Sequence, residues 1–318
     1  MPLDHYVSQV HLKNFHAPAL GEMLYAIRKI DMKPFPCQSE DVCRTPDGST
    51  NGYLKESRKI EEFLKTIEPK YNESVEKLRT NTTDADAVYV IAGFVAYVAT
   101  CSPAAMRINT GPLRGVLEAT ANIIDRRGDM PKAPAELGDK TLSELLSDGT
   151  VVMNIDGKYP QAIGIGNVMS HVGSFGNFHW DILINEHVDS PYFTSDYPVA
   201  IEQTPDPRVI NRIVPLAPDI AIRIKPLFRQ ERLQDLSFPG FKSRQRKPQL
   251  SEVRDINRHI VQSAESLVFF REDHDWVQRF VDRHKRYRVE PTIRKFPAGN
   301  GDLIWSRLEL REQEAVPA

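Results

Sequence analysis

Apolar positions along the chain predict sheet-forming ends around a helical middle. Residues 5–15 and 22–28 are rich in β-branched and aromatic residues, which predicts two extended segments joined by a Pro/Gly turn. From Ile60 to Leu78, apolar residues recur at three- and four-residue spacing, which predicts a helix. Pro69 lies inside this pattern, so we expect the helix to be kinked or split there.

The most apolar stretch of the chain, residues 88–99, predicts a helix buried in the core. Thr83 is a suitable N-cap, and the helix should end by Ser102, because the proline that follows disfavours helical backbone at the residue before it. The stretch is too short to cross a bilayer, which needs about 20 apolar residues. A further helix is expected from Pro112 to a stop at Gly128.

In the second half of the chain the pattern returns to strands. Residues 180–185 and 192–195 are predicted as neighbouring strands across a turn, and a long loop rich in Arg, Lys and Pro covers 226–250. Further elements are expected as strands at 213–216 and 220–224, short helices at 141–147 and 160–172, and helices at 251–270 and 274–284.

These elements predict an α+β fold in a single domain over residues 1–288, followed by a partly disordered tail at 289–318. A small mixed or antiparallel sheet should use the N-terminal segment and residues 180–224. The helical middle and the C-terminal helices should pack on this sheet. We expect the N-terminal strand to pair with the region around Ser195 and Asp196, which would place His5 and Asp196 in one neighbourhood.

The composition is ordinary for a globular protein and limits the classes of partner. Of the 318 residues, 41% are hydrophobic and 26% are charged, and the formal net charge is -2. So small a charge argues against wholesale electrostatic binding to nucleic acid or anionic membrane, although it leaves room for a local patch. Cys37, Cys43 and Cys101 form no close CxxC pair, so neither a disulfide framework nor a zinc site is predicted. We expect a cytoplasmic protein with no membrane contact, and residues 1–20 lack the apolar run of a signal peptide.

Five short motifs follow one another in an order that resembles the domain of unknown function 4238, a widespread microbial family. The resemblance covers roughly residues 4–285 and implies no established activity. The motifs are His5-Tyr6-Val7 with Leu12-Lys13-Asn14-Phe15, the paired Glu61 and Glu68, Phe193 to Val199 around Ser195-Asp196, Val214 to Pro218, and Val253 to Ala264 with Asn257 inside.

The chain departs from this family at two places. Ser8 stands where the family usually has proline, and Cys101-Ser102-Pro103 stands where the family often has Arg-Thr-Pro. If that arginine binds an anion in relatives, Arg107, one turn further along, is the candidate substitute. Arg107 is therefore a candidate binding residue. Asn14 and Asn257, which lie inside the motifs, are the other two candidates.

Ser195 and Asp196 are the strongest local candidates for catalysis, because a strand that ends in two short polar side chains places them where the backbone turns. Asp196 could ligate a divalent cation or act as a general base. The alternative is a structural Ser or Asx turn made rigid by Pro198. His5 has the same two interpretations, as an acid/base group or as a hydrogen-bonded structural histidine.

Glu61 and Glu68 are two helical turns apart and share a face, so with Asp196 they could hold a divalent cation. The alternative is a solvated helix face, since Lys65 is spaced to pair with both glutamates. Two basic runs, 242–247 and 283–288, could contact nucleic-acid phosphates or could simply be solvated surface.

Our leading hypothesis from the sequence is an intracellular metal-dependent hydrolase of a phosphodiester or another phosphate substrate. His5 would be the acid/base, Ser195 and Asp196 would lie at the catalytic centre, and Glu61 or Glu68 would complete the metal site. The alternative is a non-catalytic nucleic-acid-binding or interaction module. In a third hypothesis, the motifs serve a scaffold and are purely structural.

Overall fold

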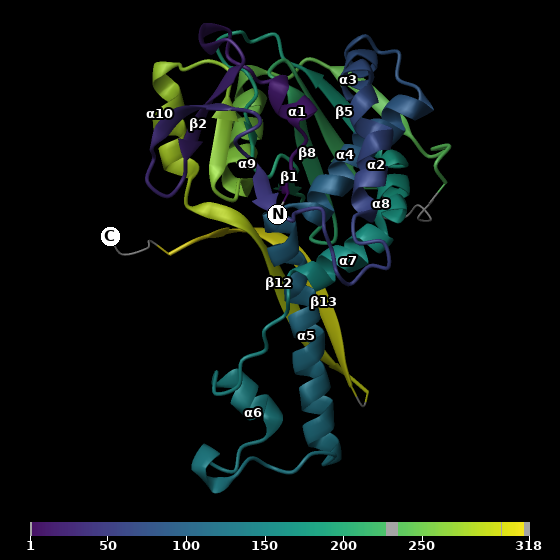
Figure 1. Cartoon of the computed structure of the whole chain (residues 1–318), viewed down its shortest axis with the longest axis vertical. Helices are drawn as coiled ribbons and strands as arrows, with labels where there is room; N and C mark the ends of the chain where they lie inside the picture. The colour runs from purple at the N-terminus through teal and green to yellow at the C-terminus, as the bar shows by residue number, and fades with distance from the viewer. Residues whose placement is uncertain (1, 227–234, 300, 315–318) are drawn as a thin grey trace.

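The computed structural model describes residues 2–226, 235–299 and 301–314. The chain is an α+β protein with a rounded body, from which a long arm projects (Figure 1). The arm consists of the far part of helix α5 (Pro103–Arg127), the short helix α6 (Leu142–Ser147), and a hairpin of β12 (Tyr287–Ala298) and β13 (Gly301–Glu312).

The body holds two larger sheets and a two-stranded one where the sequence predicts a single sheet. One is antiparallel and has the strand order β3 (Pro34–Gln38), β2 (Met23–Arg28), β11 (Leu267–Phe270), β6 (Thr194–Ser195). The other has the order β10 (Lys242–Arg246), β5 (His179–Ile184), β9 (Ile220–Lys225), β8 (Ile210–Ala217), β7 (Ala200–Gln203). Its β10–β5 pair is parallel and its other pairs are antiparallel.

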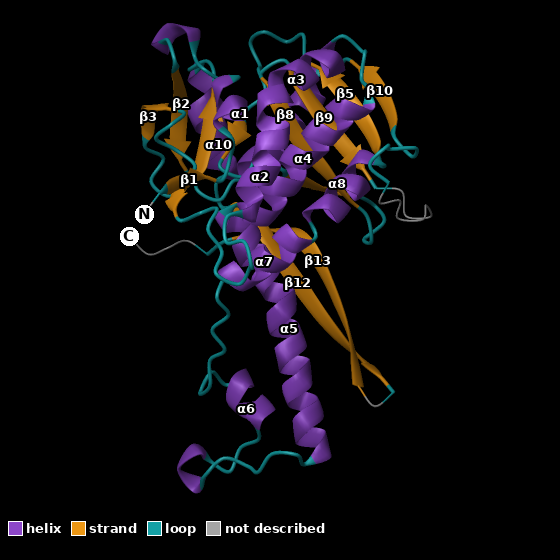
Figure 2. Cartoon of the chain, turned by 45° about the vertical axis from the view of Figure 1, so that its right-hand side comes forward, coloured by secondary structure: helices purple, strands orange, loops and turns teal. Residues whose placement is uncertain are grey.

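Helices cover these sheets and fill the space between them (Figure 2). In chain order, the remaining helices are α1 (Gln9–Lys13), α2 (Lys59–Ile67), α3 (Tyr71–Arg79), α4 (Ala85–Cys101), α7 (Lys158–Gly166), α8 (Val168–Gly176), α9 (Leu250–Ser263) and α10 (Asp275–His284). Pro69 lies in a short 3-10 turn, Glu68–Lys70, that separates α2 from α3, so the predicted split at this proline is confirmed.

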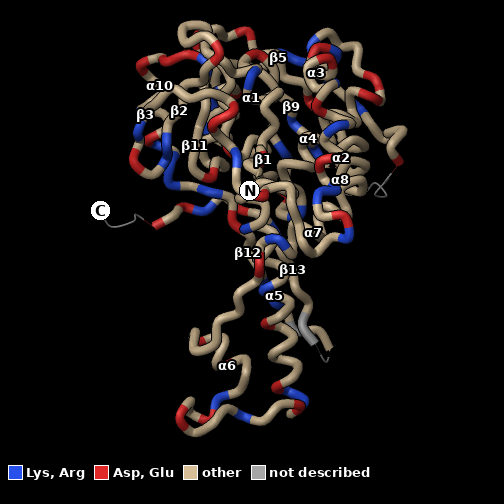
Figure 3. The backbone as a smooth tube through the Cα atoms, in the orientation of Figure 1, with Lys and Arg blue, Asp and Glu red and all other residues tan. Residues whose placement is uncertain are grey.

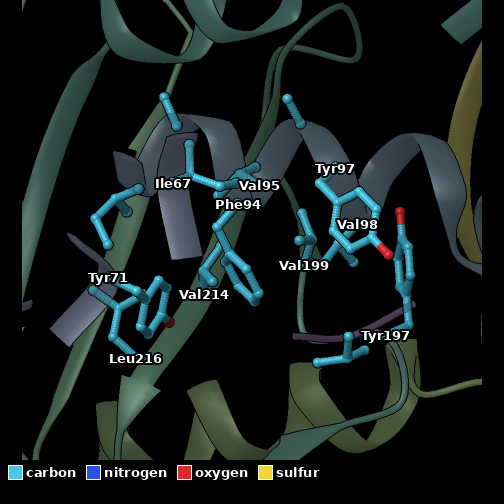
Figure 4. Close-up of a cluster of buried hydrophobic side chains, with 14 of the residues drawn as sticks. Ile67, Tyr71, Phe94, Val95, Tyr97, Val98, Tyr197, Val199, Val214 and Leu216 are labelled. Atoms are coloured by element: carbon cyan, nitrogen blue, oxygen red, sulfur yellow. The ribbon is translucent and has the colours of Figure 1, made fainter. Parts of the chain in front are cut away.

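Helix α4 is the centre of the body, as its apolar sequence predicts. Its N-cap is Asp84, which accepts a hydrogen bond of 2.8 Å from the backbone N–H of Ala87. Nearly every residue of the helix is buried, because small and branched apolar side chains point to all sides. Figure 4 shows Phe94 of α4, Tyr71 of α3 and Val214 of β8 close together in one cluster, which ties helices and sheet into one core.

The search for membrane spans found no single helix in the described residues that is long and apolar enough to cross a bilayer. Taken together, α4 and α5 would pass by length and composition, but the pair is bent by 65° at Ser102.

The expected pairing of the N-terminal strand is wrong. Strand β1 (Leu3–His5) pairs antiparallel with β4 (Arg44–Pro46) and not with the region of Ser195. Residues 9–13 form α1 instead of a strand, because the carbonyl of Ser8 accepts the N–H groups of His11 and Leu12 and both side chains are buried by this turn.

The predicted start of α5 at Pro112 is also wrong. The helix begins at Pro103, with Ser102 as N-cap and its hydroxyl accepting the N–H of Ala105. A proline after a serine ends one helix and opens the next, since proline is favoured at the first helical position. Pro112 is tolerated inside the helix.

Four predictions in the second half need correction. The loop predicted over 226–250 contains strand β10, and its residues 227–234 lie outside the described part of the chain. Residues 192–195 do not neighbour β5, because β6 pairs with β11 in the other sheet. The helix predicted over 251–270 ends at Ser263, and 267–270 form β11. The tail expected after residue 288 is instead the hairpin β12–β13. Its many charged residues make the composition look like that of a tail, but charged and apolar residues alternate with the two-residue period of a strand. Its last residues, 315–318, lie outside the described part of the chain.

Candidate functional site

The Ser195-Asp196 turn is built as a structural turn. Ser195 Oγ accepts the N–H of Tyr197 at 3.2 Å, which is the predicted Ser turn. The Asp196 carboxylate, only 3% exposed, accepts three backbone N–H groups, from Glu265, Ser266 and Leu267, at 2.9, 2.7 and 3.0 Å. This carboxylate therefore joins β6 to the turn before β11. A metal ion or substrate would have to displace these bonds.

Lys29 is the cation that accompanies Asp196 in the interior. Its Nζ donates to the carbonyls of Ala264 and Tyr287, each at 2.6 Å. Burial lowers the pKa of Lys29 to about 8, although the negative charges of Asp196 and Glu265 act to raise it. Burial raises the pKa of Asp196 to about 6, although the positive charge of Lys29 and the three backbone hydrogen bonds act to lower it.

Arg107 extends this buried group of charges to the arm. It binds both carboxylate oxygens of Glu265 at 2.9 and 2.7 Å, and donates to Glu290 at 2.8 Å and to the carbonyl of Val289 at 3.0 Å. The predicted anion ligand of Arg107 is thus supplied by two carboxylates of the protein itself. We call Lys29, Arg107, Asp196, Glu265 and Glu290 the Asp196 network; it links β2, α5, β6, the α9–β11 turn and β12.

The N-terminal segment does lie beside this network, through Tyr6 and not through His5. Burial raises the pKa of Tyr6, with further contributions from the neighbouring Cys43 and from the charges of Asp196 and Glu265. The His5 ring instead lies 3.2 Å from the carbonyl of Glu40. His5 therefore has none of the contacts predicted for an acid/base partner of Asp196.

His11 is an important buried residue whose role the sequence did not reveal. Its Nδ1 lies 2.8 Å from the hydroxyl of Tyr71 and its Nε2 lies 2.8 Å from Thr194 Oγ1. The ring stacks on Phe94 with the centroids 4.7 Å apart. Burial lowers the pKa of His11 to about 3, so the neutral ring bridges α1, α3 and β6.

Glu61 and Glu68 do not join Asp196. Glu61 lies 3.4 Å from Arg58, which is itself bound to Asp4, and Glu68 Oε1 accepts the hydroxyl of Ser8 at 2.5 Å. Within residues 2–226, 235–299 and 301–314, no group of three His, Cys, Asp or Glu side chains could hold a metal ion. The predicted metal site of Glu61, Glu68 and Asp196 is therefore not assembled.

The two predicted binding asparagines hold backbone. Asn257 is fully buried, accepts the N–H of Phe193 at 2.9 Å and donates to the carbonyl of Pro191 at 2.9 Å. Asn14 donates to the carbonyl of Leu216 at 3.1 Å and lines a pocket of about 490 Å³ beside Arg79. Both amides hydrogen-bond to backbone groups of a neighbouring segment and hold that segment in place.

Several cations of the two basic runs are already paired. In the run 242–247, which forms the edge strand β10, Arg246 binds Glu252 and Lys247 binds Glu186 at 2.6 Å. In the run 283–288, Lys285, Arg286 and Arg288 each have a carboxylate neighbour. Pairing of this kind reduces the charge that either run can offer to phosphates.

The arm carries an unpartnered apolar face. One side of α5 packs on the hairpin, where Gly111 and Gly115 let Pro291 and Ile293 approach the helix backbone. The opposite side carries an uncharged stripe at helical spacing, which we call the α5 stripe. It consists of Leu113, Val116, Leu117, Thr120 and Ile124.

The middle of the α5 stripe is open to solvent, whereas Leu113 and Ile124 near its two ends are partly buried. Val116 is 50% exposed and Leu117 is 43% exposed. Figure 3 shows that charged positions gather at the far end of the arm rather than along the middle of α5. The sequence signal for this face was the helical spacing of apolar residues, but only the structure shows which of two apolar faces stays uncovered.

A family model described as "Protein of unknown function (DUF4238)" matches residues 4–274 of the chain. No curated protein and no solved structure matches the chain.

Proposed function

The chain belongs to the DUF4238 family of proteins of unknown function, and from its geometry we propose that it is a non-catalytic interaction module that associates through its arm. The observation that carries this proposal is the α5 stripe, an apolar and uncharged helix face on an element that leaves the body. Apolar faces of this kind mark surfaces that bind a partner.

The partner that fits best is a second copy of the chain. An antiparallel two-fold pairing centred between Leu117 and Thr120 places Leu113 of one copy against Ile124 of the other and Leu117 against Thr120. Such an interface is self-complementary, and no like charges oppose each other on the stripe. Because the arm projects from the body, the two bodies would lie at opposite ends of the paired arms (Figure 1).

The size of the stripe sets the strength of the association. From Leu113 to Ile124 the helix rises about 17 Å. A stripe of this length buries far less than the roughly 800 Å² per partner of a standard stable interface. We therefore propose a reversible, concentration-dependent dimer rather than a permanent one.

Metal-dependent phosphate hydrolysis stays a prediction without geometric support. Its proposed ligands have other partners in the described residues, and the Asp196 carboxylate already accepts three backbone hydrogen bonds. Nucleic-acid contact through 242–247 and 283–288 also stays a prediction, weakened by the carboxylates that neutralise these runs.

Sedimentation velocity at protein concentrations from about 1 to 200 μM tests the proposal. The wild type should shift from monomer toward dimer across this range. Leu117→Glu should remove the shift, because a two-fold interface carries the substitution twice and each lost leucine contact is worth about 1.5–3 kcal/mol.

The matched control is Arg114→Glu, which changes the charge of an exposed residue of the same helix beside the stripe. It should dimerise like the wild type. A wild type that stays monomeric at 200 μM, or an L117E protein that dimerises as well as the wild type, would overturn the proposal.

A further inference from the structure

A pocket of about 600 Å³ lies between the body and the hairpin. On the body side it is lined by the end of α8 and by β8 and β9, and on the hairpin side by residues of β13 such as Trp305. Ile304 contacts α5 near Gly115, and successive side chains of a strand point to opposite faces. The lining takes four successive residues of β13, from both faces of the strand, and shares no residue with the α5 stripe, so the pocket does not depend on the proposed dimer.

Among the described residues, the lining combines flat aromatic side chains with cations and contains no carboxylate. Phe175, Phe178 and Trp305 supply the aromatic surface, and Arg212 and Arg307 are among the cations. Arg307 stacks over the Trp305 ring at 5.5 Å from its centroid and is neutralised by Glu309. A volume of this size falls within the range of small-molecule sites.

Arg212 is the cation that the protein leaves uncompensated. It has no salt bridge to a carboxylate among the described residues, and its Nη1 is buried without a hydrogen-bond partner there. Its described neighbours include the hydroxyl of Tyr197 and the ring of His171, whose pKa is lowered by burial, so neither supplies a negative charge. Arg212 is partly exposed, and a ligand carboxylate would offer it the charge-assisted hydrogen bonds that no carboxylate of the described residues supplies.

We propose that this pocket binds a planar aromatic carboxylate, with the ring between the aromatic side chains and the carboxylate on Arg212. Guanidinium groups recognise carboxylates by a flat, two-pronged set of donors, and they favour aromatic surroundings. The same pocket gives no counter-charge to a cationic ligand.

Isothermal titration with 2-naphthoate as the probe, and 2-naphthamide as its uncharged counterpart, tests the proposal. The full-length protein should bind 2-naphthoate saturably and at least tenfold more tightly than 2-naphthamide. Arg212→Met should remove this difference, while Arg254→Met, on the exposed face of α9, should leave it unchanged.

Trp305→Ala gives an independent reading if R212M fails to fold. It should weaken both probes alike, because the indole contacts the ring and not the carboxylate. Absence of saturable binding at millimolar 2-naphthoate, equal affinity for both probes, or an R212M protein that still prefers the carboxylate would overturn the proposal.

Discussion

At the scale of single residues, the polar side chains of the family motifs hold backbone. Ser195, Asp196 and Asn257 each bind main-chain N–H or C=O groups, and Asp196 binds three. Backbone groups buried without such partners would cost about 1–3 kcal/mol each. These residues are therefore explained by folding, without any reaction.

His11 gives the sharpest prediction at this scale. Its pKa is lowered to about 3 in the folded protein, against about 6.5 in an unfolded chain. Between these pH values the unfolded state binds the extra proton, so the free energy of unfolding should rise with pH from 3 to 6.5 and level off above. The contribution of one such group is up to about 1.4 kcal/mol per pH unit.

Urea unfolding of the wild type and of His11→Gln between pH 4 and 7 measures this contribution. The variant should be less stable at pH 7 and should show a shallower rise of stability with pH. Equal slopes in the two proteins would mean that His11 titrates normally in the folded state.

At the scale of elements, the Asp196 network joins the arm to the body. Arg107 on α5 holds both the α9–β11 turn, through Glu265, and β12, through Glu290. Arg107→Met would leave the partly buried Glu265 without the cation that binds it and Glu290 with Arg288 alone, and breaking a buried pair costs about 3–5 kcal/mol. The exposure of these side chains, about a fifth to a quarter, places the expected loss at the lower end.

Hydrogen exchange followed by mass spectrometry locates this effect. In R107M the amides of β12 should exchange faster than in the wild type, while those of α4 change little. Arg114→Met, on the exposed side of the same helix, is the control and should exchange like the wild type. Unchanged protection of β12 in R107M would show that the network does not anchor the hairpin.

The elements that the sequence predicts well are those whose apolar residues repeat with a single clear period. Helices α4 and α10 and strands β5 and β9 follow from apolar spacing alone. Ser102-Pro103 is ambiguous because a Ser-Pro step both ends a helix and caps the next one. For the site, the sequence predicts the turn at Ser195 but not its partner, since the N–H groups that bind Asp196 come from residues 265–267 and carry no side-chain signal.

At the scale of the whole molecule, body and arm have different surfaces. The body buries most of its apolar helix α4, whereas the arm leaves the middle of the α5 stripe exposed. The net charge of -2 is too small to keep two copies apart. The account's central claim is therefore a reversible two-fold dimer with antiparallel arms.

Double electron–electron resonance on Arg127→Cys, spin-labelled at the end of α5, tests this claim most directly. The native cysteines Cys37, Cys43 and Cys101 are buried, so the label should attach at one place. Antiparallel pairing about a centre between Leu117 and Thr120 separates the two labels by about 25 Å along the helix axis. At 200 μM protein we expect a single distance near 30 Å that Leu117→Glu abolishes; a distance of roughly 15 Å, or no intermolecular distance at all, would contradict the account.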